Sequence, residues 1–357
     1  MVSHSESTYG AGLRSMFSNV ELSHLKFKNN TSYTNGGAIY AFNSNLIVKH
    51  CEFISNQAPG YYSQGQKYDG DGGAVMVECL PNYTADFSNC DFIDNYGLWG
   101  GAVYTGMNHS GSISFEGCHF ENNESDKFGG AAYLKGDTIT IKRCTYKGNT
   151  GNSSAVIIAG NNAIIENSLF VNNSGAMELY NGDAVISNST IADNQCINKP
   201  VYIDAGATVY VYNSILWNIC GKEFDVGEDS KLFAGASVIN GGKSSVVVSD
   251  TSGKVFWQDS IYQAWPEFVG WSNYHLEPNS PCIGAGVDSI NMNSLVYICN
   301  ESGELMGSYI IFDLSGKKIL SERTSSGKID ISRLLTGIYI VKIELDNHLI
   351  TKKMVIQ

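Results

Sequence analysis

The sequence is short of charge, proline and long apolar runs, and each shortage excludes a class of protein. Only 16% of the 357 residues are charged and 6 are proline, but 43% are hydrophobic, which excludes a disordered acidic chain without a core. No apolar run approaches the ~18 residues that a membrane-spanning helix needs. Nine cysteines are too sparse for a disulfide scaffold, and no CxxC or Cys/His zinc spacing occurs. The sequence therefore predicts a folded chain with no membrane span, metal or cofactor.

Basic residues are also few, and the deficit lies in the first 300 residues. The whole chain has 23 Lys and Arg against 35 Asp and Glu, whereas residues 301–357 contain 8 and 7. Nucleic-acid binding depends on clustered Lys and Arg, so this acidic body excludes nucleic acid as a partner. Of the 33 asparagines, only Asn347 follows residue 300. Two domains of different character therefore meet near that point.

Gly, Asn and Ser are in excess. Together they supply 111 residues, about 31% of the chain. All three are poor formers of helix interiors and common in turns. This composition predicts a turn-rich β protein.

A repeat gives the composition its order. The segment C-x-[FY]-x-x-N begins at Cys51, Cys90, Cys118 and Cys144, and related segments begin at Leu25, Ser168, Ser189 and Ser214. Apolar residues stand five and three positions before nearly every start, and a GGA element precedes the early copies, at Gly36, Gly72, Gly100 and Gly129. Spacings of 21–39 residues with strand-forming side chains predict a solenoid, whose units bury their apolar faces only by stacking.

The apolar pattern also predicts where each unit bends. One apolar pair stands five and three positions before the start of the segment, and the other stands at the start and two positions after it. The two pairs are an odd number of residues apart, so one straight strand cannot keep both pairs on the same face. A corner must fall just before the segment begins, where turn-tolerant residues such as His24, Asn89 and Gly117 stand. The Asn near the end of each segment ends the strand that follows the corner. Stacked coils place these Asn side chains in one column. This is the geometry of a right-handed parallel β-helix with three short strands per coil.

From Gly10 to Asn218 the sequence resembles the right-handed β-helix repeat proteins, which have a pectate-lyase-like solenoid fold. The GGA and FxxN signals are similar to the repeats of chlamydial polymorphic membrane proteins. We interpret the recurring Cys, Phe and Gly positions as packing sites within the coils. Cys196 and Cys220 stand at nearly equivalent places on adjacent coils, and the sequence leaves open whether they form a disulfide.

An insertion before Cys90 marks a candidate binding side. The spacing of 39 residues there admits an excursion with Tyr61, Tyr62 and Tyr68, and the next coil adds Tyr96 and Trp99. Insertions in solenoids map to loops on one side, often the binding side. We predict that these five aromatic residues contact a glycan. The alternative is a solvated loop whose tyrosines cover coil edges.

A catalytic site is the alternative to simple binding, because many parallel β-helices are polysaccharide lyases or glycoside hydrolases. Candidate carboxylates are present at Asp69, Asp71, Asp91, Asp94, Glu121 and Asp193. No Arg, Lys or His gathers with them in the repeat pattern, so we interpret them as surface residues. The sequence therefore predicts no catalytic residue.

The repeat fades after residue 220. Residues 221–294 contain Trp257, Trp265 and Trp271, and LEPNSPCIGAGVDS from Leu276 resembles the signature that closes many bacterial β-helix domains. We predict coils over residues 1–220 and an irregular end and cap over 221–294.

The last segment, residues 295–357, alternates short strands with turns and predicts a small antiparallel β-sandwich. Its strings IIFDLSGKKIL, IDISRLLTGIYIVKI and TKKMVIQ resemble the type A sorting domain of the type IX secretion system. Matching positions are Gly316, Leu334, Gly337, Tyr339, Lys352 and Lys353. The resemblance implies the type IX machinery as a partner, export across the outer membrane of a Gram-negative bacterium, removal of the domain, and release or surface attachment.

The N-terminus has no basic segment followed by an apolar one, as a signal peptide would. Gly10 stands before Phe27 as GGAI stands before Phe53, so the chain starts inside a coil. We therefore expect a signal peptide, a cap and further coils upstream of Met1.

The predicted function is a secreted or surface-held adhesin or glycan-contacting scaffold. Its predicted partners are glycans or other cell-surface polymers. The alternatives are a polysaccharide lyase or glycoside hydrolase, and an inactive fragment.

Overall fold

The computed structural model describes residues 1–63, 66–106, 108–195, 200–219, 221–257, 261, 263–270, 272–285, 295–297, 307–313, 318–324, 328–330, 337–345 and 348–356. For residues 62–63 and 66–68, and for the strands after residue 294 except 311 and 318–321, the description covers the backbone alone. The chain divides into two compact units, Met1–Gly286 and Val287–Gln357.

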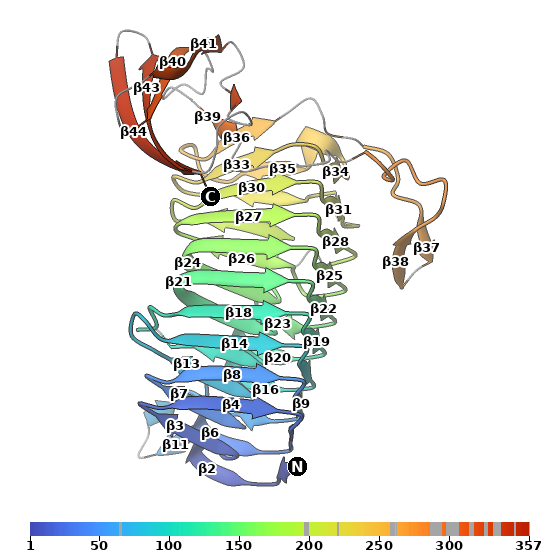
Figure 1. Cartoon of the computed structure of the whole chain (residues 1–357). Coiled ribbons are helices and arrows are strands. Elements are labelled where there is room, and N and C mark those ends of the chain that lie inside the picture. Colours follow the sequence, from blue (N-terminus) through green and yellow to red (C-terminus); the bar gives the residue numbers. More distant parts are fainter. Residues whose placement is uncertain are drawn as a thin grey trace. The chain divides into compact units, whose positions relative to one another are not determined.

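The first unit is a parallel β-helix, as the sequence predicts, in which each coil contributes strands to separate rows (Figure 1). Sheet A is the row β1 (Val2–Ser3), β5 (Lys26–Lys28), β9 (Glu52–Ile54), β15 (Asp91–Ile93), β19 (His119–Glu121), β22 (Thr145–Lys147), β25 (Leu169–Val171), β28 (Thr190–Ala192), β31 (Ile215–Trp217) and β34 (Val238–Ile239). Sheet B is the row β2 (Glu6–Tyr9), β6 (Thr31–Asn35), β10 (Gln57–Ala58), β16 (Tyr96–Trp99), β20 (Glu124–Phe128) and β23 (Thr150–Gly151).

Sheet C contains two rows of strands, which we call C1 and C2. Row C1 is β3 (Leu13–Met16), β7 (Ile39–Phe42), β13 (Val75–Glu78), β17 (Val103–Thr105), the first halves of β21 (Ala132–Lys142) and β24 (Val156–Glu166), β26 (Met177–Tyr180), β29 (Val201–Asp204), β32 (Phe224–Val226) and β35 (Val246–Val248). Row C2 is β4 (Asn19–Ser23), β8 (Asn45–Lys49), β14 (Thr84–Ser88), β18 (Ser112–Glu116), the second halves of β21 and β24, β27 (Asp183–Ser187), β30 (Thr208–Tyr212), β33 (Lys231–Ala234) and β36 (Lys254–Trp257). The ladder thus continues beyond residue 220, with a short 3-10 helix η1 (Gly242–Ser245) before β35.

The predicted corner lies between rows C2 and A. The residue before each segment has a left-handed backbone, with φ of 55° at His24, 51° at Asn89 and 63° at Gly117. This conformation reverses the parity of the alternation, so the apolar residues on both sides of the corner point inward. The corner prediction is therefore confirmed.

Aromatic and thiol columns fill the interior. The rings of Phe27, Phe53, Phe92, Phe120, Tyr146 and Phe170 stack with centroid distances of 4.5–5.1 Å. The predicted packing role of the repeat cysteines is confirmed, because Cys51, Cys90, Cys118 and Cys144 are buried free thiols in the same core. Cys196 and Cys220 lie outside the described residues, so their pairing stays open.

A buried amide ladder runs beside this core. It consists of Asn30, Asn56, Asn95, Asn123, Asn149, Asn173, Asn194 and Asn218. In each step the backbone N–H and the Nδ2 of one Asn donate to the Oδ1 of the next, as between Asn95 and Asn123 at 3.0 and 2.9 Å. The predicted Asn column is therefore confirmed, and it satisfies backbone groups at the turn between sheets A and B.

The ladder ends on an ionisable side chain, Glu223. Its Oε1 accepts from the Asn218 backbone N–H at 2.8 Å and its Oε2 from Asn218 Nδ2 at 2.6 Å. The side chain is fully buried, and this burial raises the pKa of Glu223 to about 8 against hydrogen bonds from Asn218 that lower it. The fold thus holds a carboxyl group that prefers to be protonated.

We predict that Glu223 makes the protein less stable as the pH rises. A carboxyl group with a raised pKa binds its proton more tightly when the chain is folded, so its contribution is complete below the unfolded pKa of 4.5 and is lost up to about pH 8. The expected loss is on the order of 5 kcal/mol. Thermal melts between pH 4.5 and 8.5 should show a falling midpoint, and the fall should be smaller in Glu223→Gln, in which the raised pKa of Asp71 still contributes. Equal pH dependence in both proteins would contradict this prediction.

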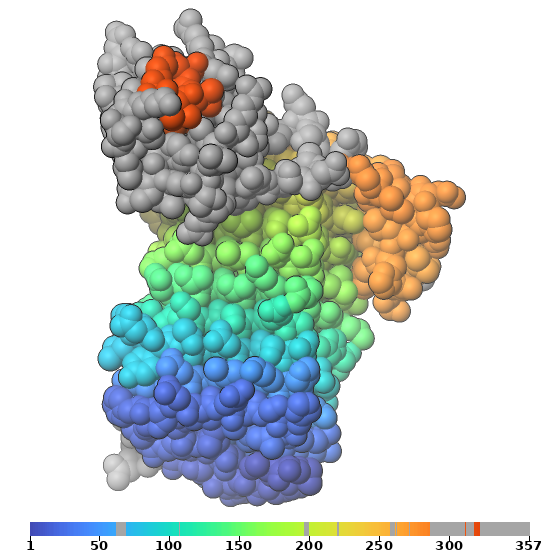
Figure 2. All heavy atoms as spheres, viewed as in Figure 1, coloured from blue at the N-terminus to red at the C-terminus, as the bar shows by residue number. Residues whose placement is uncertain are grey.

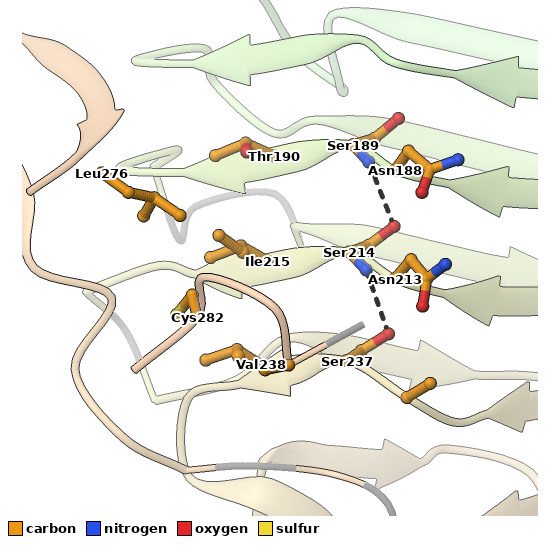
Figure 3. A pocket seen from close by; sticks show the side chains of 12 residues that line it. Asn188, Ser189, Thr190, Asn213, Ser214, Ile215, Ser237, Val238, Leu276 and Cys282 are labelled. Atoms are coloured by element: carbon orange, nitrogen blue, oxygen red, sulfur yellow. Dashed lines mark hydrogen bonds between the residues drawn. The ribbon is translucent and has the colours of Figure 1, made fainter. Parts of the chain in front are cut away.

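A C-terminal segment of the first unit lies along the outer face of sheet A. Trp265 packs on Trp217 of β31 at 5.2 Å, and the hairpin of β37 (Phe268–Gly270) and β38 (Asn273–Leu276) follows it. The Tyr274 hydroxyl donates to Asp193 Oδ2 at 2.9 Å. Figure 3 shows Leu276 and Cys282 facing Thr190, Ile215 and Val238 across a cavity of about 240 Å³. These contacts lie on the side of the stack, and the predicted role as a cap of its end stays a prediction.

The second unit is antiparallel. Strands β41 (Lys318–Thr324), β40 (Gly307–Asp313), β43 (Gly337–Leu345) and β44 (His348–Ile356) form one sheet, and β39 (Leu295–Tyr297) pairs with β42 (Lys328–Asp330). The predicted class, a parallel β-helix followed by a small antiparallel β domain, is confirmed.

Candidate functional site

A row of large side chains projects outward from C1 in successive coils. Tyr40, Met76, Tyr104 and Tyr133 are direct neighbours in the register of β7, β13, β17 and β21. Residues on either side of each, such as Val103 beside Tyr104, face the core, so the alternation of a strand turns this row to the outer face. The row is nevertheless largely covered: Tyr40 is 8% exposed and Tyr104 3%.

The GGA element explains this burial. Gly100 has φ of 62°, and a Cβ there would lie 2.1 Å from the Val103 carbonyl oxygen, so only glycine allows the chain to turn this sharply. The corner brings the last residues of sheet B strands against the outer face of C1. Tyr9 and Trp99 from sheet B, together with Phe42 and Tyr133 from row C1 itself, pack on Tyr40, Met76 and Tyr104. We call these seven residues the aromatic cluster; Figure 2 shows one face of the coils that carry it, coloured blue to cyan.

Trp99 is the predicted site residue that joins the cluster. Its ring centroid lies 5.0 Å from Phe128 and 5.5 Å from Tyr133. Tyr96, on the same strand, instead donates its hydroxyl to Asp126 Oδ2 at 2.8 Å. The two predicted contacts of this strand therefore have different surroundings.

The insertion forms a hairpin whose return leg reaches Trp99. Strands β11 (Tyr61–Ser63) and β12 (Gln66–Tyr68) pair antiparallel, with Tyr61 opposite Tyr68 and Tyr62 opposite Lys67. The side chains of Tyr62 and Tyr68 lie outside the described part of the chain, and Tyr61 is half-buried. After β12, Asp69 Oδ2 lies 2.6 Å from Lys127 Nζ, which itself stands 5.3 Å from the Trp99 ring centroid. The insertion is thus tied to the aromatic cluster.

Asp71 is the unusual carboxylate of this region. Its backbone bridges Asn35 on one side and Trp99 on the other. Its Oδ1 is buried and has no hydrogen-bond partner among the described residues. Burial first and the charge of Asp69 second raise the pKa of Asp71 to about 7, against an opposing effect of Lys127. The same two carboxylates contribute to the raised pKa of Tyr104, after burial as its main cause.

The other candidate carboxylates lie elsewhere. Asp91 faces Glu52 and His119 on sheet A, Asp94 occupies a turn with φ of 54°, and Asp193 accepts from Tyr274. Glu121 lies 2.8 Å from Lys147 Nζ and 3.1 Å from His119 Nε2, and the pKa of Glu121 is lowered, first by Lys147 and then by His119. The expectation that no basic residue accompanies these acids was therefore wrong for Glu121 and for Asp69.

Sequence reasoning missed most of the cluster. Tyr40, Tyr104 and Tyr133 follow the buried residue after GGA, and simple alternation would have placed them outward. The same outward row continues through Ile157, Glu178, Tyr202 and Asp225. The hydroxyl of Tyr180 donates to Glu178 Oε2 at 2.7 Å and that of Tyr202 to Asp204 Oδ2 at 2.8 Å. In the described ranges, no three His, Cys, Asp or Glu side chains are arranged to hold a metal ion.

The sorting-signal positions lie in the second unit. Gly337 and Tyr339 belong to β43 and stand opposite Ile356 and Met354. Lys352 and Lys353 belong to β44, opposite Val341 and Ile340. Gly316 and Leu334 lie outside the described residues.

The stacked coils define a parallel β-solenoid, and comparison with protein families gives its class. Residues 2–145 and 129–280 match the right handed beta helix region, so the chain belongs to the right-handed β-helix family. Residues 290–357 match the secretion system C-terminal sorting domain. This tail links the chain to type IX secretion and implies secretion or export to the cell surface.

Individual relatives add little to this. The chain is 25% identical over 323 residues to a metabotropic glutamate receptor-like protein R of Dictyostelium discoideum, which covers 88% of this chain but 18% of that protein. The chain thus spans less than a fifth of this relative. No solved structure matches the chain. Within the described residues, no helix has the length and apolar character needed to cross a membrane.

Proposed function

We propose that this protein acts outside the cell as an adhesin or glycan-contacting scaffold, and that the aromatic cluster is its glycan-binding site. The observation that supports this proposal is the pair of partly exposed rings Trp99 and Tyr133, which lie 5.5 Å apart and pack over the covered rings of Tyr40 and Tyr104. Aromatic rings provide rigid apolar surface with a polar edge, which suits a sugar ring that has one apolar face. Solenoids use such extended faces to bind long ligands.

The charges around the cluster favour a neutral glycan. The first 300 residues have an excess of acidic residues, and Lys127 is already paired with Asp69. The acidic residues would therefore repel a polyanionic glycan, and the ammonium group of Lys127 would not compensate for this repulsion because it is paired with Asp69. Carboxylates and hydroxyls are suitable partners for the hydroxyl groups of a neutral sugar.

We also propose that the mature body resides at the outer surface of a Gram-negative cell, with the tail as its export signal. The matched sorting domain supports export but not the final location. Protease treatment of intact cells tests this: a surface-held body should be digested, and a released body should be recovered from the medium. Retention of the body inside treated cells would contradict the proposal.

The binding proposal predicts that Tyr133→Ala weakens glycan binding about tenfold or more. Tyr133 is half-buried and contacts both Tyr104 and Trp99, so its loss removes one of the partly exposed rings of the aromatic cluster. A tenfold loss corresponds to about 1.4 kcal/mol, the range of one aromatic contact. A glycan array with the whole chain, followed by titration of the bound glycan, supplies the measurement.

The matched control is Tyr210→Ala. Tyr210 is an outward aromatic residue on row C2, stacked on Phe233 at 4.8 Å. This variant should bind like the unchanged protein. Equal affinity of the Tyr133 variant and the unchanged protein, or no glycan bound by the unchanged protein, would contradict the proposed function.

A further inference from the structure

We infer that a hollow at the turns between rows C1 and C2 binds a small zwitterion of the size of a free α-amino acid. In this site Lys135 holds the carboxylate of the ligand, Asp137 holds its ammonium group, and the buried His109 donates a further hydrogen bond to the carboxylate. None of the residues that line the hollow belongs to the aromatic cluster. The inference therefore goes beyond the proposed glycan binding and does not rest on it.

The hollow lies between two long turns and two straight strands. Residues 79–83 join β13 to β14 and residues 106–111 join β17 to β18, whereas β21 and β24 pass the same place without a turn. A cavity of about 700 Å³ is lined by residues from all four of these coils. This volume is in the range of small-molecule sites. Asp137 and Asn161 on its wall are exposed, so the hollow is open to solvent.

His109 is a buried donor on the wall of the hollow. The residue is 2% exposed, and its Nδ1 accepts from the Cys79 backbone N–H at 3.1 Å. Burial lowers the pKa of His109 to about 4, against a smaller opposing effect of the Gly111 backbone, so the ring is neutral and carries its proton on Nε2. This Nε2 is buried and has no hydrogen-bond partner among the described residues. A buried donor without a partner costs free energy, which a ligand oxygen would restore.

The strand beside this nitrogen bears two opposite charges. A Cβ atom at Gly136 would lie 3.5 Å from His109 Nε2, so the nitrogen stands next to the residue between Lys135 and Asp137. Both charged residues line the hollow, and they are about 7 Å apart along the strand. Asp137 Oδ1 accepts from Asn161 Nδ2 at 3.0 Å, which fixes the carboxylate at the wall. A cation and an anion therefore flank the buried donor.

These two charges favour a zwitterion over other small molecules. Asp137 would repel an anion, and Lys135 would repel a cation. A neutral sugar would displace water from both charged groups without offering an opposite charge, which costs free energy. An amino acid offers both charges at once, and charge-assisted hydrogen bonds are the stronger ones.

The remaining wall is compatible with such a ligand. The Lys135 ammonium group has three donors, so it can hold a carboxylate beside the contact that it already makes in the folded chain. The half-buried ring of Tyr83 gives the side chain of the ligand an apolar surface.

Isothermal titration calorimetry of the whole chain tests the inference, with alanine, serine, glutamine and phenylalanine at millimolar concentrations. Propionate and ethylamine are matched control ligands, because they correspond to alanine without its ammonium group and without its carboxylate. Glucose represents a neutral polyol. We expect the amino acids to bind about tenfold or more tightly than propionate, ethylamine or glucose, since each control ligand lacks at least one charge-assisted hydrogen bond.

Two variants and one control assign the roles. Asp137→Asn keeps the shape of the side chain but removes its charge, and it should weaken amino-acid binding about tenfold or more. His109→Asn places an acceptor near the position of the ring Nδ1, so the bond from Cys79 can persist while the Nε2 donor is lost; this variant should also bind about tenfold more weakly. Asp91→Asn, on the outer face of sheet A, should bind like the unchanged protein.

Thermal melts establish that each variant is folded. Asp137 is exposed, so its variant gives a decisive result even where the His109 variant unfolds. Failure of all four amino acids to bind would overturn the inference, and so would unchanged affinity of the folded Asp137→Asn protein. Equal affinity for propionate, ethylamine and alanine would overturn it as well. Binding of glucose in place of the amino acids would overturn this inference while the proposed glycan binding stands.

Discussion

Replacing Phe92 by alanine is expected to lower the free energy of unfolding by about 3–5 kcal/mol. The ring is 0% exposed and stacks between Phe53 at 4.8 Å and Phe120 at 4.6 Å. Its flat sides therefore contact the coils before and after it, while Phe87 and Phe115 meet it edge-on at 5.8 and 6.4 Å. Loss of the ring removes buried apolar area and leaves a cavity that reaches two neighbouring coils.

The cavity should stay open because the neighbouring coils cannot move together. Backbone hydrogen bonds hold β15 in register with β9 and β19 on both sides, and these bonds fix the spacing of the coils at about 4.8 Å. Chemical denaturation of the whole chain, followed by circular dichroism, gives the measurement. Ile164→Ala is the control, since this side chain faces outward and is 38% exposed, and it should cost less than about 1 kcal/mol. Equal effects of the two substitutions would contradict the stacked core.

Much of the β-helix could be predicted because its coils repeat the same physical requirements. Each coil needs a large inward apolar residue after the corner, a corner residue that tolerates positive φ, and a turn amide, so the pattern survives individual substitutions. The ninth copy was missed because it retains the geometry without these residue types. Ser237 starts it, and Ala236 has φ of 43° at the corner position, although alanine rarely adopts that conformation.

The candidate site was harder to predict because it depends on an insertion. Asp69 and Lys127 are 58 residues apart and form an ion pair only because the hairpin leaves and rejoins the coil beside Trp99. No repeat spacing relates these positions. The outward Tyr row, in contrast, was available from the sequence, since the residue after an inward strand residue must face outward.

Replacing Asn123 by leucine should destabilise the fold by about 3–6 kcal/mol, because it leaves several buried polar groups without partners. Asn123 is 0% exposed, and its Oδ1 accepts from the Asn95 backbone N–H at 3.0 Å and from Asn95 Nδ2 at 2.9 Å. Its Nδ2 donates to the Phe92 carbonyl oxygen at 2.8 Å and to Asn149 Oδ1 at 2.9 Å. Leucine has a similar volume, so the loss reports hydrogen bonding more than packing.

Asn123→Asp separates the donor and acceptor roles of the same side chain. A carboxylate can still accept from Asn95 but would face the Phe92 carbonyl oxygen and Asn149 Oδ1, both acceptors, so its pKa in the folded state should rise above the unfolded value of about 3.9. The protonated form restores a donor, and this variant should therefore be most stable at low pH and lose stability as the pH rises through its raised pKa. Measured in the Glu223→Gln background, which removes the pH dependence due to Glu223, melts at pH 4 and pH 7 should show this difference for Asp and a smaller one for Leu. Asn162→Leu, at an exposed position of β24, should change stability by less than about 0.5 kcal/mol; if Asn123→Leu is equally mild, the amide ladder does not stabilise the stack.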